Sequence, residues 1–444
     1  MPICPRRRCR RMGTHEKKHS RLDLLQNIVI PLLTVSAVML FAATQISSLS
    51  QGSNLLNRWF SASSSPAAAA AEEEAAPLSA PVRVAVSGTY GRYGSVTLSS
   101  GSEEFIPLAT RLGEALGSAR SFLSCESQDF MDALSQPSIF YDFWEALPLS
   151  VLAELISLPD MPAAIASTNA RQLVVSASDS GTVQLLLWDG EGTYLRCGTA
   201  ITAGDLENTI SRYELGGAYF AFDYAENSET FQQVFSRSLF LDPLPQLPQL
   251  SVANALTDTD AVLTRLGFNP YTNSRYMESG GTEVVTEGDQ SVRLLPEGII
   301  RYQGSGKSDL SIDAESETPT LWEAVSGASE LLNSLLSGHT GDAVLYLQWV
   351  QQTGSATVLR FGYQAGGVPI RFADGTCAAE VVLSGTAVSS LTLCFRQYTA
   401  GGEASLLLPL KQAISIAARQ EGKELFIAYT DNGADTASAA WLLE

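Results

Sequence analysis

The chain has 444 residues, 45% of them hydrophobic and 17% charged, which is enough apolar side chain to fold and too much length for one ordinary core. Its charge is uneven: beyond residue 27 the chain holds 20 of the 28 Lys and Arg and 45 of the 47 Asp and Glu, a net charge of −25. So acidic a body argues against nucleic acid as a partner, because nucleic-acid binding depends on cations that neutralise phosphates.

The first 49 residues have the pattern of a membrane anchor. Residues 1–27 form a basic leader with eight Lys and Arg, and Ile28–Leu49 follows with no charge over 22 residues. A helix needs about 20 apolar residues to cross the hydrocarbon core of a bilayer. The positive-inside rule then predicts that the leader is cytoplasmic and that the chain after residue 49 is outside. A cleaved signal peptide is the alternative, but the leader is long for a signal and Phe41–Thr44 fits a cleavage site poorly.

A linker and a first folded region are expected next. Residues 50–80 are rich in Ala, Ser, Glu and Pro and low in complexity, which is typical of a spacer that does not pack. Residues 81–245 should form a first extracytoplasmic α+β region, and the turn Asp189–Gly192 predicts a hairpin within it. The expected elements, in order, are a strand at 82–86, a helix at 104–119, a strand at 138–143, a helix at 149–158, strands at 172–176, 183–188 and 194–198, a helix at 203–213 and a strand at 218–222.

The run Leu241–Leu250 contains three prolines, which cannot continue a helix or a central strand, and it is the best internal boundary. Beyond it we expect a helix plus β-meander at 246–318 and a C-terminal α+β domain at 319–444. The predicted fold class is therefore α+β: one N-terminal transmembrane helix, then a body of antiparallel sheets with packed helices in two to three domains. The expected elements are a helix at 252–266, strands at 282–286, 290–294 and 298–302, a helix at 320–336, strands at 343–351, 356–364, 377–384 and 388–398, a helix at 409–419 and strands at 424–429 and 439–443.

Six cysteines are present, and none forms a CxxC pair. Cys4 and Cys9 lie in the leader, where a zinc site is not expected. The four body cysteines allow three connectivities for two disulfides if the body is exported, and they could equally be buried free thiols. The first pair to test would be Cys377 with Cys394, since these lie on neighbouring predicted strands. The body cysteines are Cys125, Cys197, Cys377 and Cys394.

Motifs of known enzyme classes are missing from the sequence. Gly304–Ser308 resembles part of a phosphate loop, but the motif requires Gly at the position of Arg301. No G-x-S-x-G nucleophile elbow occurs, and no Ser lies three positions before any of the body lysines. His339 is the one histidine of the body and lies in a Ser-Gly-His-Thr-Gly turn, which favours a solvated side chain. The sequence thus predicts no catalytic, cofactor-binding or metal-binding residues and no cofactor.

Two further features keep alternatives open. Asp431–Asp435 could contact calcium, but it lacks EF-hand spacing and an Asn-Gly hairpin turn explains it more simply. A hydrolase that uses two of the many carboxylates stays an alternative, and it predicts two close carboxyls in a cleft, at least one with a raised pKa.

Three segments carry a pattern of strand and turn residues. Residues 276–302 run from Tyr-Met-Glu-Ser-Gly-Gly through Thr-Glu-Gly-Asp-Gln-Ser-Val-Arg to Gly-Ile-Ile-Arg-Tyr, residues 358–370 contain Val-Leu-Arg-Phe-Gly-Tyr and Gly-Val-Pro-Ile, and residues 425–443 contain Leu-Phe-Ile-Ala-Tyr and Ala-Trp-Leu-Leu. With the order of leader, membrane segment, linker and body, they resemble the YycH/YycI family of extracytoplasmic regulators of an essential cell-wall sensor kinase in Gram-positive, Firmicutes-type bacteria. The chain departs from that family at Ala439, where the family pattern has a proline before Ala-Trp.

The resemblance implies a membrane-anchored, non-enzymatic regulator of a two-component sensor histidine kinase, which it contacts through its transmembrane helix. A second related regulator is a further implied partner. Four small residues in the membrane segment would allow close helix packing, although they could equally face lipid. The alternative is an extracytoplasmic scaffold or ligand-binding module of the cell envelope. The small residues are Ser36, Ala37, Ala42 and Ala43.

Overall fold

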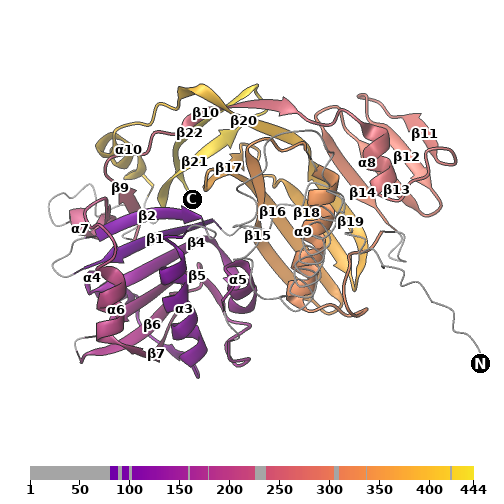
Figure 1. Ribbon diagram of the computed structural model, residues 1–444. Helices are drawn as coiled ribbons and strands as arrows, with labels where there is room; N and C mark the ends of the chain where they lie inside the picture. Colours follow the sequence, from indigo (N-terminus) through magenta and orange to yellow (C-terminus); the bar gives the residue numbers. More distant parts are fainter. Residues whose placement is uncertain are drawn as a thin grey trace, which may run out of the picture. The chain divides into compact units, whose positions relative to one another are not determined.

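A computed structural model describes the chain over residues 81–88, 93–99, 103–158, 161–178, 180–225, 237–304, 310–336, 338–420 and 423–444. The expected leader, the transmembrane segment 28–49 and the linker lie outside these residues. None of the helices described is both long and apolar enough to cross a bilayer. The described part is α+β, with eight helices and two sheets whose strands are mostly antiparallel (Figure 1).

The first sheet is built from residues 81–241, and all of its strand pairs are antiparallel. Hairpins join β5 (Asn169–Ala177) to β6 (Thr182–Trp188) and β6 to β7 (Tyr194–Thr202), the second of them through the turn Asp189–Gly192, as predicted. The order across the sheet is β3 (Leu123–Ser124), β7 (Tyr194–Thr202), β6 (Thr182–Trp188), β5 (Asn169–Ala177), β4 (Ser138–Pro148), β1 (Pro81–Ser87), β2 (Tyr93–Ser99), β8 (Ala218–Phe220) and β9 (Leu239–Leu241).

Helices cover both faces of this sheet. Successive residues of a strand point to opposite faces, so neighbouring residues of β4 contact different helices. On one face Ile139 and Tyr141 pack with α3 (Ile106–Ser118), whose Leu108, Leu112 and Leu116 repeat every four residues and are all buried. On the other face Phe140 packs with α4 (Ser127–Ser135). The remaining helices of this half are α5 (Leu149–Leu155), α6 (Ala203–Ile210) and α7 (Ala221–Ala225).

The second sheet uses residues 248–443 and contains one parallel pair, β17 with β21. The β-meander and the C-terminal strands belong to the same sheet, because β14 pairs with β19 and β10 pairs with β20 and β22. The order is β11 (Ser274–Met277), β12 (Glu283–Glu287), β13 (Gln290–Leu294), β14 (Ile299–Gln303), β19 (Ala387–Cys394), β18 (Ala379–Ser384), β16 (Ala356–Ala365), β17 (Val368–Phe372), β21 (Leu425–Asp431), β22 (Thr436–Leu443), β10 (Pro248–Asn254) and β20 (Arg396–Ala404), with β15 (Ala343–Thr353) paired to β16. Its helices are α8 (Thr259–Arg265), α9 (Leu321–Leu336) and α10 (Leu410–Ala417).

Most predicted elements are confirmed with shifted ends, but two predictions are wrong. The helix expected at 252–266 begins only after its N-cap Asp258, whose side chain accepts a hydrogen bond from Ala261 N at 3.0 Å. The residues before it form β10, where Leu250 and Val252 are buried at the two-residue spacing of a strand. The strand expected at 388–398 is interrupted at Phe395 and contributes to two strands, β19 and β20. The prediction also missed β2, β3, β9, β11, β17, α4 and α7.

The two sheets share one apolar core. The chain passes from β9 to β10 through the proline-rich residues 242–247. Helix α5 contacts α9, and β4 contacts β15, so each sheet packs against elements of the other half. One cluster of buried residues accordingly includes side chains from both halves, such as Leu149 and Leu332.

Candidate functional site

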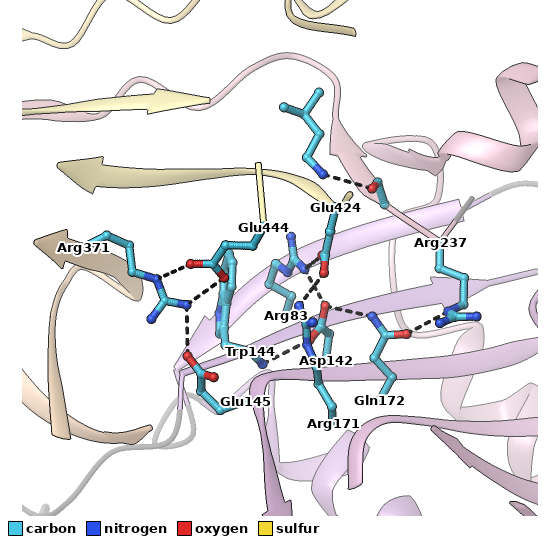
Figure 2. A network of polar contacts seen from close by, with 12 residues as sticks. Arg83, Asp142, Trp144, Glu145, Arg171, Gln172, Arg237, Arg371, Glu424 and Glu444 are labelled. Atoms are coloured by element: carbon cyan, nitrogen blue, oxygen red, sulfur yellow. Dashed lines mark hydrogen bonds and ion pairs between the residues drawn. The ribbon is translucent and has the colours of Figure 1, made fainter. Parts of the chain in front are cut away.

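A group of buried charges lies where the two sheets meet, and Figure 2 shows it from close by. Arg83 on β1 donates from Nη2 both to Asp142 Oδ2 on β4 and, at 2.6 Å, to Glu424 Oε1, which comes from the second sheet just before β21. Arg171 on β5 forms a second ion pair with Glu424, and its Nε lies 3.8 Å from Asp142 Oδ1. These groups form the junction cluster, which we define as Arg83, Asp142, Arg171, Gln172, Arg237 and Glu424.

Strand register brings three members of this cluster together: Arg83, Asp142 and Gln172. Arg83 is directly opposite Asp142 on β4, and Asp142 is directly opposite Gln172 on β5. The row continues through Trp188 on β6 to Tyr194 on β7. Directly opposed residues of an antiparallel pair have their Cβ atoms about 5 Å apart on the same face, so long polar side chains reach one another.

Arg237 closes the cluster at its far end. Its Nε donates to Gln172 Oε1 at 3.0 Å, and Gln172 Nε2 donates to Asp142 Oδ2 at 3.3 Å. Its guanidinium lies over the Trp188 ring, 4.4 Å from the centroid, and its Nη1 donates to Tyr194 Oη at 2.7 Å. A desolvated cation over an aromatic face is held by the ring quadrupole as well as by hydrogen bonds.

Asp142 and Arg83 are ionised at neutral pH despite their burial. Burial alone would raise the pKa of Asp142, but the adjacent Arg83 and Arg171 outweigh it and hold that pKa below its ordinary value. Burial likewise opposes the charge of Arg83, yet Asp142 and Glu424 raise the pKa of its guanidinium. Asp142 is 1% exposed, so water contributes little to stabilising its charge. That charge depends on the arginines.

The backbone of β4 is distorted at Trp144, and the ring of this residue contacts the second sheet. The pairing of β4 with β5 breaks between Asp142 and Leu147, and within this break Trp144 has a φ of +66°, a left-handed conformation that costs free energy for a non-glycine residue. The Trp144 N–H donates to Asp142 Oδ1 at 3.0 Å. Its ring lies beneath the Arg83 guanidinium, 4.0 Å from the centroid, and meets Phe426 of β21 edge-on at 5.2 Å.

Glu145, the residue after Trp144, belongs to a second group of ion pairs, which is centred on Arg371. Glu145 Oε1 accepts from Arg371 Nη2 on β17 at 2.9 Å, and Arg371 Nε lies 3.3 Å from Glu444 Oε1 (Figure 2). Arg371 Nη1 also donates to Tyr346 Oη at 3.1 Å. Burial raises the pKa of Glu145, and Arg371 offsets this only in part. The close carboxyls at the junction are thus bridged by arginine: Asp142 and Glu424 by Arg83, and Glu145 and Glu444 by Arg371.

A cavity of about 220 Å³ lies beside the cluster. Arg83 and Trp144 form its polar end, and the remaining lining is mostly aliphatic and comes from both sheets. Its lining residues are Arg83, Trp144, Leu239, Leu241, Pro245, Leu247, Gly366, Gly367, Val368, Ile427 and Trp441.

The junction cluster should make stability sensitive to acid. The pKa of Asp142 is lower in the folded than in the unfolded chain, so its contribution is present above about pH 4, the ordinary value, and is lost as pH falls through the folded pKa. We expect urea midpoints between pH 7 and 3 to fall more steeply for the wild type than for Asp142→Asn. Asp132→Asn, an exposed site with the same charge change, should keep the wild-type slope. Equal slopes for all three proteins would contradict the assignment.

The residues considered from sequence lie elsewhere. His339 follows α9 in a turn and meets Phe395 edge-on at 6.1 Å. Asp431 is buried, accepts from Tyr398 Oη at 2.8 Å and Gly433 N at 2.8 Å, and so stabilises the β21–β22 hairpin as the turn explanation predicts. Of the phosphate-loop candidate, residues 305–308 lie outside the described part. Across the described segments, no group of three or more His, Cys, Asp and Glu side chains could hold a metal ion.

Cys125, Cys197, Cys377 and Cys394 are all free thiols in the structure. Cys197 and Cys394 are buried, and Cys125 and Cys377 are half-buried. Burial is the main cause that raises the pKa of Cys197 and of Cys394, each to about 11, so neither is a reactive thiolate at neutral pH.

Comparison with protein-family models, with curated proteins and with solved structures finds no match to this chain.

Proposed function

We propose that this protein is a membrane-anchored, non-enzymatic regulator of a two-component sensor kinase in cell-envelope homeostasis. It acts by contact, through residues 28–49 in the membrane and an extracytoplasmic body. The observation that carries the proposal is the uncharged run of 22 residues behind eight cations, which precedes a large folded body. The resemblance of three segments to YycH/YycI regulators also supports it. These segments form β11–β14, β16–β17 and β21–β22, which all belong to the second sheet.

The junction cluster supports a role in transmission. Its buried charges engage one another across the two sheets, with Glu424 of one sheet held by Arg83 and Arg171 of the other. A shift of either sheet would strip partners from desolvated charges, which is costly. Binding on one sheet can therefore bias the other, and such a body can pass a signal to its anchor without chemistry.

In the membrane, regulation requires a difference in contact. A helix shifts the two-state equilibrium of a kinase only if it binds one state better than the other. Ser36, Ala37, Ala42 and Ala43 would let such a helix approach its neighbour closely, since small residues permit tight helix packing in lipid.

Removing the body tests the proposal. A chain cut after residue 49 keeps the leader and the membrane segment and loses the folded part. We expect kinase-dependent transcription to differ between this truncation and the full-length protein, with a complete deletion as reference. Transcription that is unchanged both in the truncation and in the complete deletion would refute the proposal.

A second candidate function is an extracytoplasmic scaffold or ligand-binding module, and the cavity at the sheet junction favours it. This candidate differs in one respect: it needs an anchor of any sequence, whereas a kinase regulator needs the contacts of its own membrane helix.

A further inference from the structure

We propose that the junction cavity binds a small amphipathic carboxylate, with its acyl chain among the aliphatic residues and its carboxylate at Arg83 and Trp144. This inference rests on the ligand-binding candidate and not on kinase regulation, so either can fail without the other.

The size of the cavity sets the size of the ligand. An engineered apolar cavity of about 150 Å³ takes up benzene, which has six heavy atoms. In proportion, about 220 Å³ suits roughly nine or ten heavy atoms. A linear carboxylate of seven or eight carbons has this size, whereas a two-chain phospholipid is far too large. The acyl part would meet Leu239, Leu241, Leu247, Val368 and Ile427.

Two buried donors define the polar end. Arg83 Nε and Trp144 Nε1 are both buried, and no residue in the described part of the chain accepts a hydrogen bond from either. Arg83 is 8% exposed and Trp144 5%, so solvent does not compensate. Buried N–H groups without acceptors are rare because they lose their bonds to water on folding. Both nitrogen atoms are covered by neighbouring atoms, so a ligand oxygen at this end of the cavity would accept from them only after the Arg83 or Trp144 side chain turns toward it.

Charge favours an anionic oxygen over a neutral one. Among the described residues that line the cavity, Arg83 is the one charged side chain and none is a carboxylate. A hydrogen bond from a guanidinium to a carboxylate is also about twice as strong as one between neutral groups.

The backbone at Trp144 is independent support. Its left-handed φ of +66° persists because Asp142 accepts from its N–H and Phe426 packs against its ring. Unfavourable backbone conformations of this kind concentrate at ligand-binding positions, where they fix a side chain in place. Here the conformation fixes one wall of the cavity.

The test uses tryptophan quenching by 6-bromohexanoate, which has nine heavy atoms, at pH 7, with the full-length protein in lipid nanodiscs and empty nanodiscs subtracted. Trp144 and Trp441 line the cavity, so a bound bromine lies close to both. We expect saturable quenching by the acid and an apparent affinity at least tenfold weaker for 6-bromohexanol. Quenching that rises linearly with concentration, as lipid partitioning would produce, overturns the proposal, and so does equal affinity for the alcohol.

Matched variants locate the site. Leu241→Phe fills the cavity and should weaken binding at least tenfold, whereas Leu406→Phe makes the same change at a side chain that is 94% exposed and should leave it unchanged. Val368→Phe fills the cavity from the other sheet and replaces Leu241→Phe if that variant does not fold. Wild-type affinity in a folded cavity-filling variant would overturn the assignment.

Discussion

Replacing Glu424 by Gln is expected to lower the free energy of unfolding by about 3–5 kcal/mol. Gln keeps the shape of the side chain but removes the charge that Arg83 and Arg171 both contact. Two buried guanidinium groups would then share Asp142 alone, and a buried charge that has lost its partner is far more costly than a missing surface ion pair. The change in unfolding free energy can be measured by urea denaturation at pH 7.

An exposed ion pair supplies the control. Arg360 Nε donates to Glu380 Oε2 at 2.7 Å between β16 and β18, and both side chains are at least 36% exposed. Glu380→Gln should cost about 0–1 kcal/mol, because solvent screens such a pair. A loss for Glu424→Gln no larger than that for Glu380→Gln would show that the junction cluster does not hold the two sheets together.

Leu332→Ala is expected to cost about 2–5 kcal/mol. Leu332 is fully buried on α9, which packs on β15, β16 and β18 and also contacts α5 of the first half. Ala is the better helix former, so the loss would come from the lost packing and the cavity left behind.

Glu330→Ala on the exposed side of the same helix is the matched control, and its effect should stay within about 0.5 kcal/mol. Urea unfolding measures both variants. Comparable small effects at the two positions would mean that α9 is not packed as the structure shows.

The hairpins and amphipathic helices could be predicted because their signals are local. On α9, Val325, Leu332 and Leu336 follow helical spacing and are buried, and Leu321 packs at the core margin. The error at 252–266 has a local cause as well. The apolar residues of β10 fit a helical pattern when joined to those of α8, and Asp258 marks the true helix start.

The junction cluster was not predicted from sequence. One signal was present, since Arg83 is the single charge of β1, and Asp142 and Glu145 are the two charges of the mostly apolar β4. Such charges need partners when buried. The partner Glu424 is 341 residues away from Arg83 and lies in the other sheet, and no local pattern encodes that pairing. Neither the cavity nor the left-handed Trp144 leaves a trace in the sequence.

In the proposed function, the roles are divided within one chain. The junction cluster joins charges of both sheets, the cavity beside it would take a small carboxylate, and residues 28–49 would supply the contact in the membrane. A ligand that binds between the sheets would change the free-energy difference between states of the body only through its differential affinity for them. Because Arg83 and Arg171 of one sheet both hold Glu424 of the other, a ligand that shifts one sheet would produce such a difference.

The most direct test exchanges the membrane segment alone. Residues 28–49 would be replaced by an unrelated transmembrane helix of the same length, with residues 1–27 and 50–444 kept and the amount and orientation of the protein verified. Kinase-dependent transcription is the measurement. Regulation by helix contact predicts that the exchanged protein behaves like the complete deletion. Transcription equal to that of the wild-type protein would contradict this account and favour a scaffold or ligand-binding module.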